Sequence, residues 1–287
     1  QLAARFEEAE RDPSVAAIVF EGVGKAFVAG ADIRFFVEAI KTDAFERIYA
    51  FTKRGQELFS RIATSEKSTI AFVDGIALGG GAELALACQK IVSTSRARFA
   101  FPETGIGIYP GLGGTQRLPR RVGKAMARYL ILCGKMLGAS DAFAVGLVDA
   151  VLKEGTSGDE VNRAAAIVSL AKQGRRTGGD DGRVPGWTSA ASHLFSDECI
   201  DTVLSKELPD PLDEPSRAFA EKAVRQLSYK APVALKIASK LIEEGSQVSI
   251  DEGLQKELDH LEEIFSTEDA LEGLSSVGKR RAHFKGQ

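Results

Sequence analysis

Short apolar stretches alternate with helical periods through the first half of the chain, and glycine-rich turns separate them. Residues 15–20 and 69–73 are largely apolar stretches of strand length, whereas residues 35–62 carry their apolar side chains on one stripe, as a long helix does. A closing strand is predicted over residues 148–152. Strands that alternate with helices in this way predict an α/β core.

The composition changes beyond this core. Residues 174–186 are rich in glycine and charge, which predicts a loop. Residues 196–208 have a helical period, and further helical periods follow one another from Ser216 onward. We therefore predict three parts: a core over residues 1–153, an insertion of helix and loop over residues 154–228, and a C-terminal helical region over residues 229–287.

The charge balance and the cysteines argue against several classes of protein. With 37 basic and 40 acidic residues the net charge is −3, so no overall basic field attracts nucleic acid or an anionic membrane. No apolar run is long enough to span a bilayer. The three cysteines stand far apart without a CxxC pair, which argues against a disulfide framework or a metal site and favours a reducing, cytoplasmic location.

A run of three glycines precedes a charged residue in an otherwise apolar helix. Residues 79–81 allow a positive φ or a close backbone approach, and Glu83 follows them at the predicted helix start. The N–H groups at such a start form an anion site. Taken alone, the pattern is better explained by an acid that complements the helix dipole after a tight turn.

A second acid stands in a comparable position. Glu103 ends the apolar stretch 99–103 and precedes the glycine-rich segment 105–114, and in isolation it is best interpreted as a capping or surface carboxylate. Residues 27–32 end a strand in another glycine turn. Two glycine turns can present backbone donors and two acids can transfer protons, a combination that suits enolate chemistry.

Other catalytic templates do not fit. Residues 22–25 lack the spacing and the Ser or Thr of a phosphate-binding loop, and Pro110 stands where a dinucleotide fingerprint needs glycine. The sequence has no G-x-S-x-G elbow, H-E-x-x-H motif or Cys–His pairing. We interpret His193, His260 and His283 as surface or packing residues.

Together these segments resemble the crotonase superfamily, also called the enoyl-CoA hydratase/isomerase family. The resemblance covers about residues 1–172 and 230–287, and it is carried by ordered motifs at residues 27–33, 73–84, 101–118, 144–148 and 279–285. It implies a crotonase-type ββα-superhelix core, with a C-terminal helical region that completes the coenzyme A site. It also implies a homotrimer or a hexamer.

The resemblance implies a role for individual residues. The N–H groups of Ala31 and Gly80 would form an oxyanion hole for the thioester carbonyl, and Glu83 and Glu103 would be an acid–base pair that holds one water molecule. Further implied contacts to the acyl-CoA are Ala29, Asp32, Ile33, Arg34, Gly79, Gly111 and, toward a phosphate of the coenzyme, Lys279. Coenzyme A is part of the substrate, so we expect no separate cofactor and no metal.

These roles imply an enoyl-CoA hydratase, which adds water syn to a 2-enoyl-CoA and gives a 3-hydroxyacyl-CoA in fatty-acid-type β-oxidation. The acid pair and Gly111 favour this reaction, because isomerases of the superfamily typically keep one acid and the hydrolase branch carries an acid where Gly111 stands. An enoyl-CoA isomerase or a 3-hydroxyacyl-CoA thioester hydrolase on the same fold stays open. So does a non-catalytic acyl-CoA-binding module of a multifunctional enzyme.

Two departures from the family pattern concern the organisation of the chain. The opening strands that usually precede the first helix are missing, and the chain begins with Gln1 instead of Met. A fragment of a longer polypeptide, such as a fusion to a 3-hydroxyacyl-CoA dehydrogenase, would explain both. Residues 174–228 also interrupt the usual connection to the C-terminal helices, and residues 194–200 within them resemble the hydrolase branch.

Overall fold

The computed structural model describes residues 1–152, 160–172 and 184–286, which fall into two compact units. Unit 1 comprises Gln1–Gly30, Arg54–Phe99 and Leu137–Pro185, and unit 2 comprises Ala31–Lys53, Ala100–Met136 and Gly186–Gln287. Most of the predicted loop over residues 174–186 lies outside the described residues. The division of the chain at residues 153 and 228 stays a prediction.

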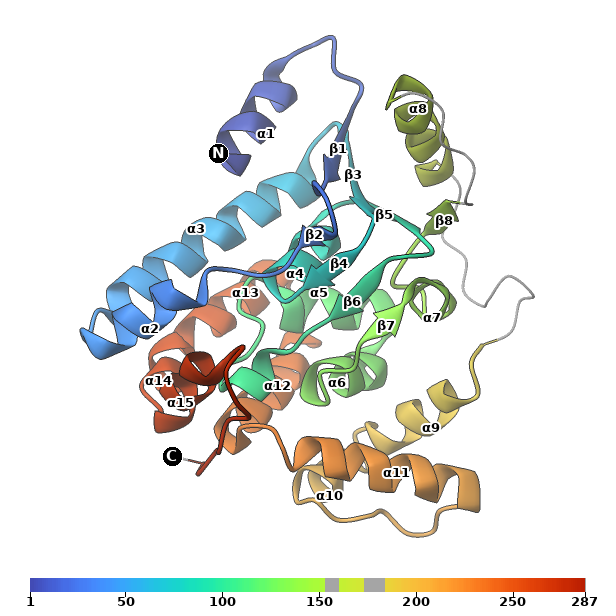
Figure 1. Ribbon diagram of the computed structural model, residues 1–287. Coiled ribbons are helices and arrows are strands. Elements are labelled where there is room, and N and C mark those ends of the chain that lie inside the picture. The colour runs from blue at the N-terminus through green and yellow to red at the C-terminus, as the bar shows by residue number, and fades with distance from the viewer. Residues whose placement is uncertain (153–159, 173–183, 287) are drawn as a thin grey trace. The chain divides into compact units, whose positions relative to one another are not determined.

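Unit 1 contains two four-stranded sheets (Figure 1). The strands are β1 (Ala17–Glu21), β2 (Ala26–Val28), β3 (Ser68–Val73), β4 (Ile76–Leu78), β5 (Lys90–Thr94), β6 (Arg98–Ala100), β7 (Leu137–Gly138) and β8 (Ala150–Leu152). The first sheet has the order β1-β3-β5-β8, and its neighbouring strands are parallel. The second has the order β2-β4-β6-β7, in which β2 and β4 are parallel and β6 and β7 are antiparallel.

Helices pack against these strands. They are α1 (Leu2–Arg11), α4 (Gly80–Ala87), α7 (Ala139–Ala144) and α8 (Glu160–Ala171). Almost every residue of β3 is buried, as expected for a parallel strand that is covered on both faces. Ile70, Phe72 and Val92 form an apolar core with Ile167 and Ala171 of α8, while α4 contacts β2, β3, β4 and β5. The predicted α/β core is confirmed.

The single long helix predicted over residues 35–62 is divided in two. Unit 2 contains α2 (Ile33–Lys41), and α3 (Phe45–Thr64) begins in unit 2 and ends in unit 1. The break includes Asp43, whose φ of 52° lies in the left-handed region that ends a helix. Phe35 and Phe36 of α2 contact the ring of Phe51 in α3, so the apolar stripe continues across the break and conceals it in the sequence.

The described part of unit 2 is helical. Its further elements are η1 (Glu103–Ile106, a 3-10 turn), α5 (Gly114–Val122), α6 (Lys124–Leu132), α9 (Trp187–Leu194), α10 (Ile200–Leu204), α11 (Glu214–Leu227), α12 (Pro232–Gly245), α13 (Ile250–Asp259), α14 (Leu261–Phe265) and α15 (Glu268–Ser276). The largely buried α12 is central, because it contacts η1, α5, α6, α13 and α14. The helix predicted over residues 196–208 is wrong in extent, since only α10 forms there, and α9 was not predicted.

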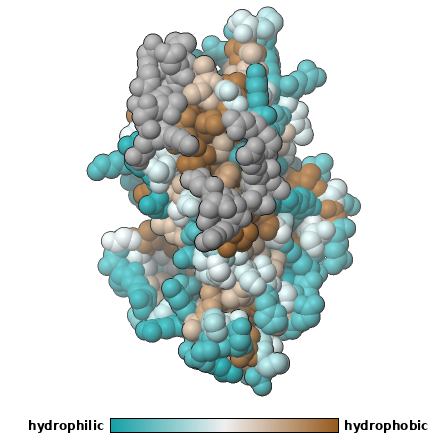
Figure 2. Space-filling view, turned by 90° about the vertical axis from the view of Figure 1, so that its right-hand side faces the viewer, coloured by the Kyte–Doolittle hydropathy of each residue, from teal (hydrophilic) through white to brown (hydrophobic). Residues whose placement is uncertain are grey.

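Charged and polar side chains are widespread on the molecular surface. Figure 2 shows teal side chains over much of the visible face, with brown side chains in smaller groups between them. None of the helices in the described ranges is both long enough and apolar enough to cross a membrane.

Candidate active site

The helix that carries Glu83 begins at a turn that favours glycine. Gly79 has φ 52° and ψ −122°, and α4 starts at the next residue. A Cβ atom on Gly81 would lie 2.0 Å from the carbonyl oxygen of Val28, so the first turn of α4 packs directly on the end of β2. Both expectations for the glycine run, a positive φ and a close backbone approach, are confirmed.

Glu83 lies inside an apolar helix. Its exposed fraction is 2%, and α4 is buried from Gly81 to Ala87. The N–H of Glu83 donates to the carbonyl of Gly79 at 2.9 Å, which holds the first turn in place. Glu83 lies in the first turn of α4, as its interpretation as a dipole-complementing acid requires, but that interpretation does not account for its burial. Aligned N–H dipoles favour a carboxylate at this position, whereas desolvation opposes its charge.

Glu103 is buried as well, which contradicts its interpretation as a surface carboxylate. It begins η1, directly after Pro102, and its exposed fraction is 6%. Its carbonyl accepts from the N–H of Ile108 at 3.1 Å. The next side chain anchors the turn on α6, because the hydroxyl of Thr104 lies 3.2 and 3.1 Å from the carbonyl oxygens of Ile131 and Leu132.

Close backbone packing holds the other side of η1. Gly107 has φ 85°, and a Cβ atom there would lie 2.2 Å from the carbonyl oxygen of Asp269 in α15. A Cβ atom on Gly273 of α15 would lie 2.3 Å from the carbonyl group of Ile106. The turn that carries Glu103 is therefore fixed between α6 and α15 within unit 2.

The two predicted oxyanion donors follow glycine turns in different units. Gly80 is the first residue of α4, so its N–H belongs to the group of helix-start donors without an intrahelical acceptor. Ala31 follows Gly30, which has φ 96°, and it precedes α2. Ala31 and the predicted contact Ala29 are both exposed. Gly80 and Glu83 lie in unit 1, whereas Ala31 and Glu103 lie in unit 2.

Asp32 and Arg34 bind each other at the start of α2. Asp32 is the N-cap, and Oδ1 accepts from the backbone N–H of Arg34 at 3.0 Å. The guanidinium of Arg34 donates to both carboxylate oxygens at 3.0 and 2.8 Å. The hydrogen bonds from Arg34 lower the pKa of Asp32. The contacts between Asp32 and Arg34 match the simpler interpretation of residues 27–32 as a strand end and turn before a helix.

A buried glutamate that we did not predict holds the glycine-rich loop after Glu103. Glu257 of α13 is 0% exposed, and its carboxylate accepts from the N–H groups of Gly113 and Thr115 at 2.8 and 3.2 Å and from the hydroxyl of Thr115 at 2.5 Å. It thereby caps α5, whose N-cap Gly113 has no side chain. Tyr109 donates to the carbonyl of Glu257 at 2.5 Å. The predicted contact Gly111 lies between these two anchors.

The basic residues near the C-terminus have different partners. Arg280 forms a bidentate pair with Glu272 at 2.5 and 2.7 Å, and the guanidinium of Arg281 lies 4.4 Å from the ring centre of Tyr229. The exposed ammonium of Lys279 donates to a backbone carbonyl of α15 at 3.0 Å. Lys279 therefore has the least committed charge of the three, which suits its predicted contact with a phosphate.

Two of the three histidines are exposed, and the third pairs with an acid. His193 and His283 are exposed, and Nδ1 of His260 lies 2.6 Å from the carboxylate of Glu263. In the part of the chain that the structure describes, no group of three or more His, Cys, Asp or Glu residues could hold a metal ion.

Comparison with known proteins decides the family. The model of the family described as enoyl-CoA hydratase/isomerase matches residues 1–283. The chain belongs to the enoyl-CoA hydratase/isomerase family. A crotonyl-CoA hydratase of Syntrophomonas wolfei is 33% identical over 275 residues, which cover 95% of this chain and 82% of that protein. A short-chain-enoyl-CoA hydratase of Clostridium acetobutylicum is 32% identical over 275 residues, which cover 96% of this chain and 81% of that protein.

Two solved structures have a similar fold. An enoyl-CoA hydratase from Rhodobacter sphaeroides matches with a TM-score of 0.80 at 24% identity, over 100% of this chain and 84% of that chain. A carnitinyl-CoA dehydratase from Mycobacterium thermoresistibile matches with a TM-score of 0.78 at 23% identity, over 96% of this chain and 80% of that chain. The crotonase fold predicted from the sequence is confirmed.

The described residues of the predicted insertion fall in both units: α8 packs on β3, β5 and β8 of unit 1, and α9 packs on α6 of unit 2. The ring of Tyr129 in α6 lies 5.8, 5.4 and 5.2 Å from the rings of Trp187, Phe195 and Phe219. These aromatic contacts join α9 and α11 to a helix that also contacts η1. Packing is therefore one role of this departure from the family pattern.

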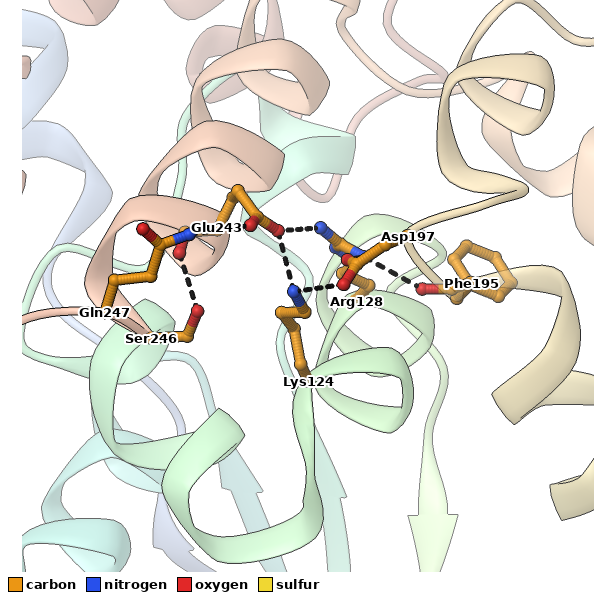
Figure 3. A network of polar contacts seen from close by, with 7 residues as sticks. All are labelled: Lys124, Arg128, Phe195, Asp197, Glu243, Ser246 and Gln247. Atoms are coloured by element: carbon orange, nitrogen blue, oxygen red, sulfur yellow. Dashed lines mark hydrogen bonds and ion pairs between the residues drawn. The ribbon is translucent and has the colours of Figure 1, made fainter.

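An ion-pair network reinforces the same contact (Figure 3). Arg128 of α6 is 2% exposed, and it donates to Asp197 at 2.7 Å, to Glu243 of α12 at 2.5 Å and to the carbonyl of Phe195 at 3.2 Å. Lys124 donates to the same two carboxylates at 2.6 and 2.9 Å. Desolvation lowers the pKa of Lys124, but these two hydrogen bonds outweigh it and leave the pKa raised.

Proposed function

We propose that this chain is an enoyl-CoA hydratase that adds water across the double bond of a 2-enoyl-CoA in fatty-acid-type β-oxidation. Membership of the family and relatives named as crotonyl-CoA and short-chain-enoyl-CoA hydratases support this reaction class. The observation that carries the proposal is the burial of both Glu83 and Glu103, each beside a tightly packed glycine turn. Burial of two carboxylates is costly, and proton transfer is a function that would retain them.

In the proposed site the N–H groups of Ala31 and Gly80 bind the thioester oxygen. Addition of water builds negative charge on that oxygen, and one preorganised donor lowers such a barrier by about 3–4 kcal/mol in other enzymes. One glutamate takes a proton from the water molecule while the water oxygen attacks the β-carbon of the substrate. The other glutamate delivers a proton to the α-carbon. Two acids that share one water molecule titrate as a coupled pair.

The proposal is tested by the loss of enoyl-thioester absorbance when crotonyl-CoA is added. Loss of one general acid–base group typically costs about 10²–10⁴-fold in rate, so we expect a decrease of that order in Glu83→Gln and in Glu103→Gln. Glu207→Gln, an exposed acid in unit 2, is the control with wild-type turnover. Wild-type turnover by the Glu83→Gln, Glu103→Gln double variant would refute the proposal.

The same preparation distinguishes the alternatives that the sequence leaves open. Faster conversion of a 3-enoyl-CoA than hydration of crotonyl-CoA would indicate an isomerase. Thiol release from 3-hydroxyisobutyryl-CoA would indicate a hydrolase. Tight binding of crotonyl-CoA without any turnover would indicate an acyl-CoA-binding module.

We propose that Lys279 binds a phosphate of coenzyme A, and that the other substrate contacts are Ala29, Asp32, Ile33, Arg34, Gly79 and Gly111. The support for Lys279 is its exposed ammonium, which donates to a neutral backbone carbonyl. Lys279→Met should raise KM for crotonyl-CoA and leave KM for crotonyl-pantetheine unchanged, because the shorter thioester lacks the nucleotide phosphates. An equal rise for both substrates would contradict this role.

The assembly follows from the family resemblance, and the location from the widely separated cysteines of the sequence. We propose a homotrimer or a hexamer in the cytoplasm, with no separate cofactor, and a fusion to a 3-hydroxyacyl-CoA dehydrogenase as the parent polypeptide. Light scattering on the purified chain measures its mass in solution, and a monomer at micromolar concentration would contradict the proposed homotrimer or hexamer. The full gene product decides whether a dehydrogenase domain adjoins this chain.

A further inference from the structure

A cavity in unit 2 lies beside the ion-pair network of Figure 3. Its volume is about 530 Å³, within the range of about 300–1,000 Å³ that small-molecule sites occupy. Asp197 and α10 form one side of it, α12 forms another, and Arg128 of α6 also lines it. The lining that the structure describes includes none of the residues assigned to the proposed active site. The cavity is therefore a candidate for a second binding site.

Two polar side chains that line the cavity are more than nine-tenths buried. Arg128 is 2% exposed, and Ser239 of α12 is 8% exposed. The guanidinium of Arg128 donates to Asp197 and Glu243, but its Nε is a buried donor without an acceptor among the described residues. Within the same residue ranges the hydroxyl of Ser239 has no hydrogen-bond partner either. Buried polar groups are ordinarily satisfied, so these two side chains indicate a polar ligand.

Further charged side chains of both signs line the cavity and remain available to a ligand. Lys236 and Lys240 lie on the α12 side, Asp201 lies on the α10 side, and all three are exposed. Among the described residues, Lys236 and Asp201 form no ion pair. Lys240 has a long contact of 3.9 Å with Glu244, which lies nearer to Lys256, at 2.9 Å. The cavity therefore offers cations on one side and an anion on the other.

Apolar side chains on the α10 side narrow the choice of ligand. Ile200 and Leu204 line the cavity on the same helix as Asp201. An inorganic anion bound by the lysines leaves this apolar surface and Asp201 without a role, and a dianion is repelled by Asp201. A molecule with a carboxylate, an ammonium and a short apolar body satisfies all of these groups.

We propose that this cavity binds a free α-amino acid with an apolar side chain. The two lysines of α12 and the hydroxyl of Ser239 bind the carboxylate, and Asp201 binds the ammonium. The apolar residues of α10 pack against the side chain of the ligand. The site lies within unit 2 and does not depend on the proposed hydratase function, so its occupancy is measured without any turnover.

Isothermal titration calorimetry with L-leucine measures this binding. Two matched probes each lack one charged group: 4-methylpentanoate has no ammonium, and 3-methylbutylamine has no carboxylate. Loss of one hydrogen bond to a charged group costs about 10- to 100-fold in affinity, so we expect both analogues to bind more weakly than L-leucine by at least that factor. Equal binding of 4-methylpentanoate, or no heat from L-leucine at millimolar concentration, would overturn the proposal.

Substitutions of exposed residues locate the bound molecule without a threat to folding. Asp201→Asn should weaken L-leucine by about 10- to 100-fold and leave 4-methylpentanoate unaffected, because only L-leucine carries the ammonium. The double variant Lys236→Met, Lys240→Met should weaken both ligands. Lys222→Met and Glu207→Gln, which replace exposed charges elsewhere in unit 2, are the controls with unchanged binding. Wild-type affinity for L-leucine in Asp201→Asn or in the double lysine variant would place the ligand elsewhere and refute the assignment.

Discussion

Replacement of Glu257 by glutamine tests whether a buried carboxylate organises the loop that follows Glu103. The wild-type carboxylate accepts three hydrogen bonds from Gly113 and Thr115, and the side chain is 0% exposed. Glutamine has a similar volume but only one acceptor oxygen, so its NH₂ group must face at least one donor of the loop. At least one charge-assisted hydrogen bond is lost.

The expected cost follows from these contacts. A hydrogen bond to a charged group contributes about 1.5–3 kcal/mol, and the remaining bonds weaken when the acceptor becomes neutral. We therefore expect Glu257→Gln to lower the free energy of unfolding by about 2–4 kcal/mol, a large share of the 5–15 kcal/mol typical of folded proteins. Urea unfolding, followed by circular dichroism, measures this difference.

The control lies on the same helix. Glu252 forms an exposed capping box with Ser249 at the start of α13, so Glu252→Gln changes the same functional group in water. Its effect should be a small fraction of that of Glu257→Gln. If the two variants lose equal stability, the argument that Glu257 holds the loop is refuted.

Three further predictions concern other parts of the structure. Gly81→Ala should destabilise the fold severely, because a Cβ atom there would lie 2.0 Å from the carbonyl oxygen of Val28. Gly186→Ala is the control and should be neutral, because a Cβ atom there has no neighbour within 4 Å. Thermal unfolding compares the stability of the two variants. The hydrogen bonds from Arg280 lower the pKa of Glu272 from 4.5 to about 2. The Glu272 contacts that hold the C-terminal tail, residues 279–286, should therefore be fully formed above about pH 4.5 and be lost as the pH falls through 2. Hydrogen exchange of residues 279–286 measures this, and unchanged protection at pH 2 would contradict it. Burial raises the pKa of Cys133 to about 12, so this thiol should resist iodoacetamide at pH 8 until the protein is unfolded, as mass spectrometry of the labelled peptide will show.

The local features of the site were legible in the sequence because they depend on residue type and spacing. A glycine run ahead of an apolar helix predicted the positive φ at Gly79 and the close approach at Gly81, and both are present. The same local logic misjudged Glu103. Considered alone, Glu103 was better explained as a capping or surface carboxylate and Glu83 as an acid that complements the helix dipole, whereas the combination of motifs and the family resemblance favoured a pair. Burial depends on what packs over a side chain, which its neighbours in sequence do not specify.

Three structural features were not predicted, because the local sequence pattern does not mark them. The break between α2 and α3 was hidden because the apolar stripe continues across it. The helix α9 is short, and its contact with the Tyr129 ring comes from α6, far away in the sequence. A charged side chain such as that of Arg128 in α6 is expected at the surface. It is buried because Asp197 and Glu243 approach it from other elements.

The sequence alone determined the α/β alternation, the glycine turns, the positions of Glu83 and Glu103, and the family. These features are encoded by backbone preferences and by motifs within short segments. Only the tertiary structure decided that Glu257 caps a helix 144 residues earlier and that Arg128 is paired with Asp197 and Glu243. The physical reason is that a buried charge is stable only where packing supplies its partners, and partners that are distant in sequence are brought together only when the chain folds.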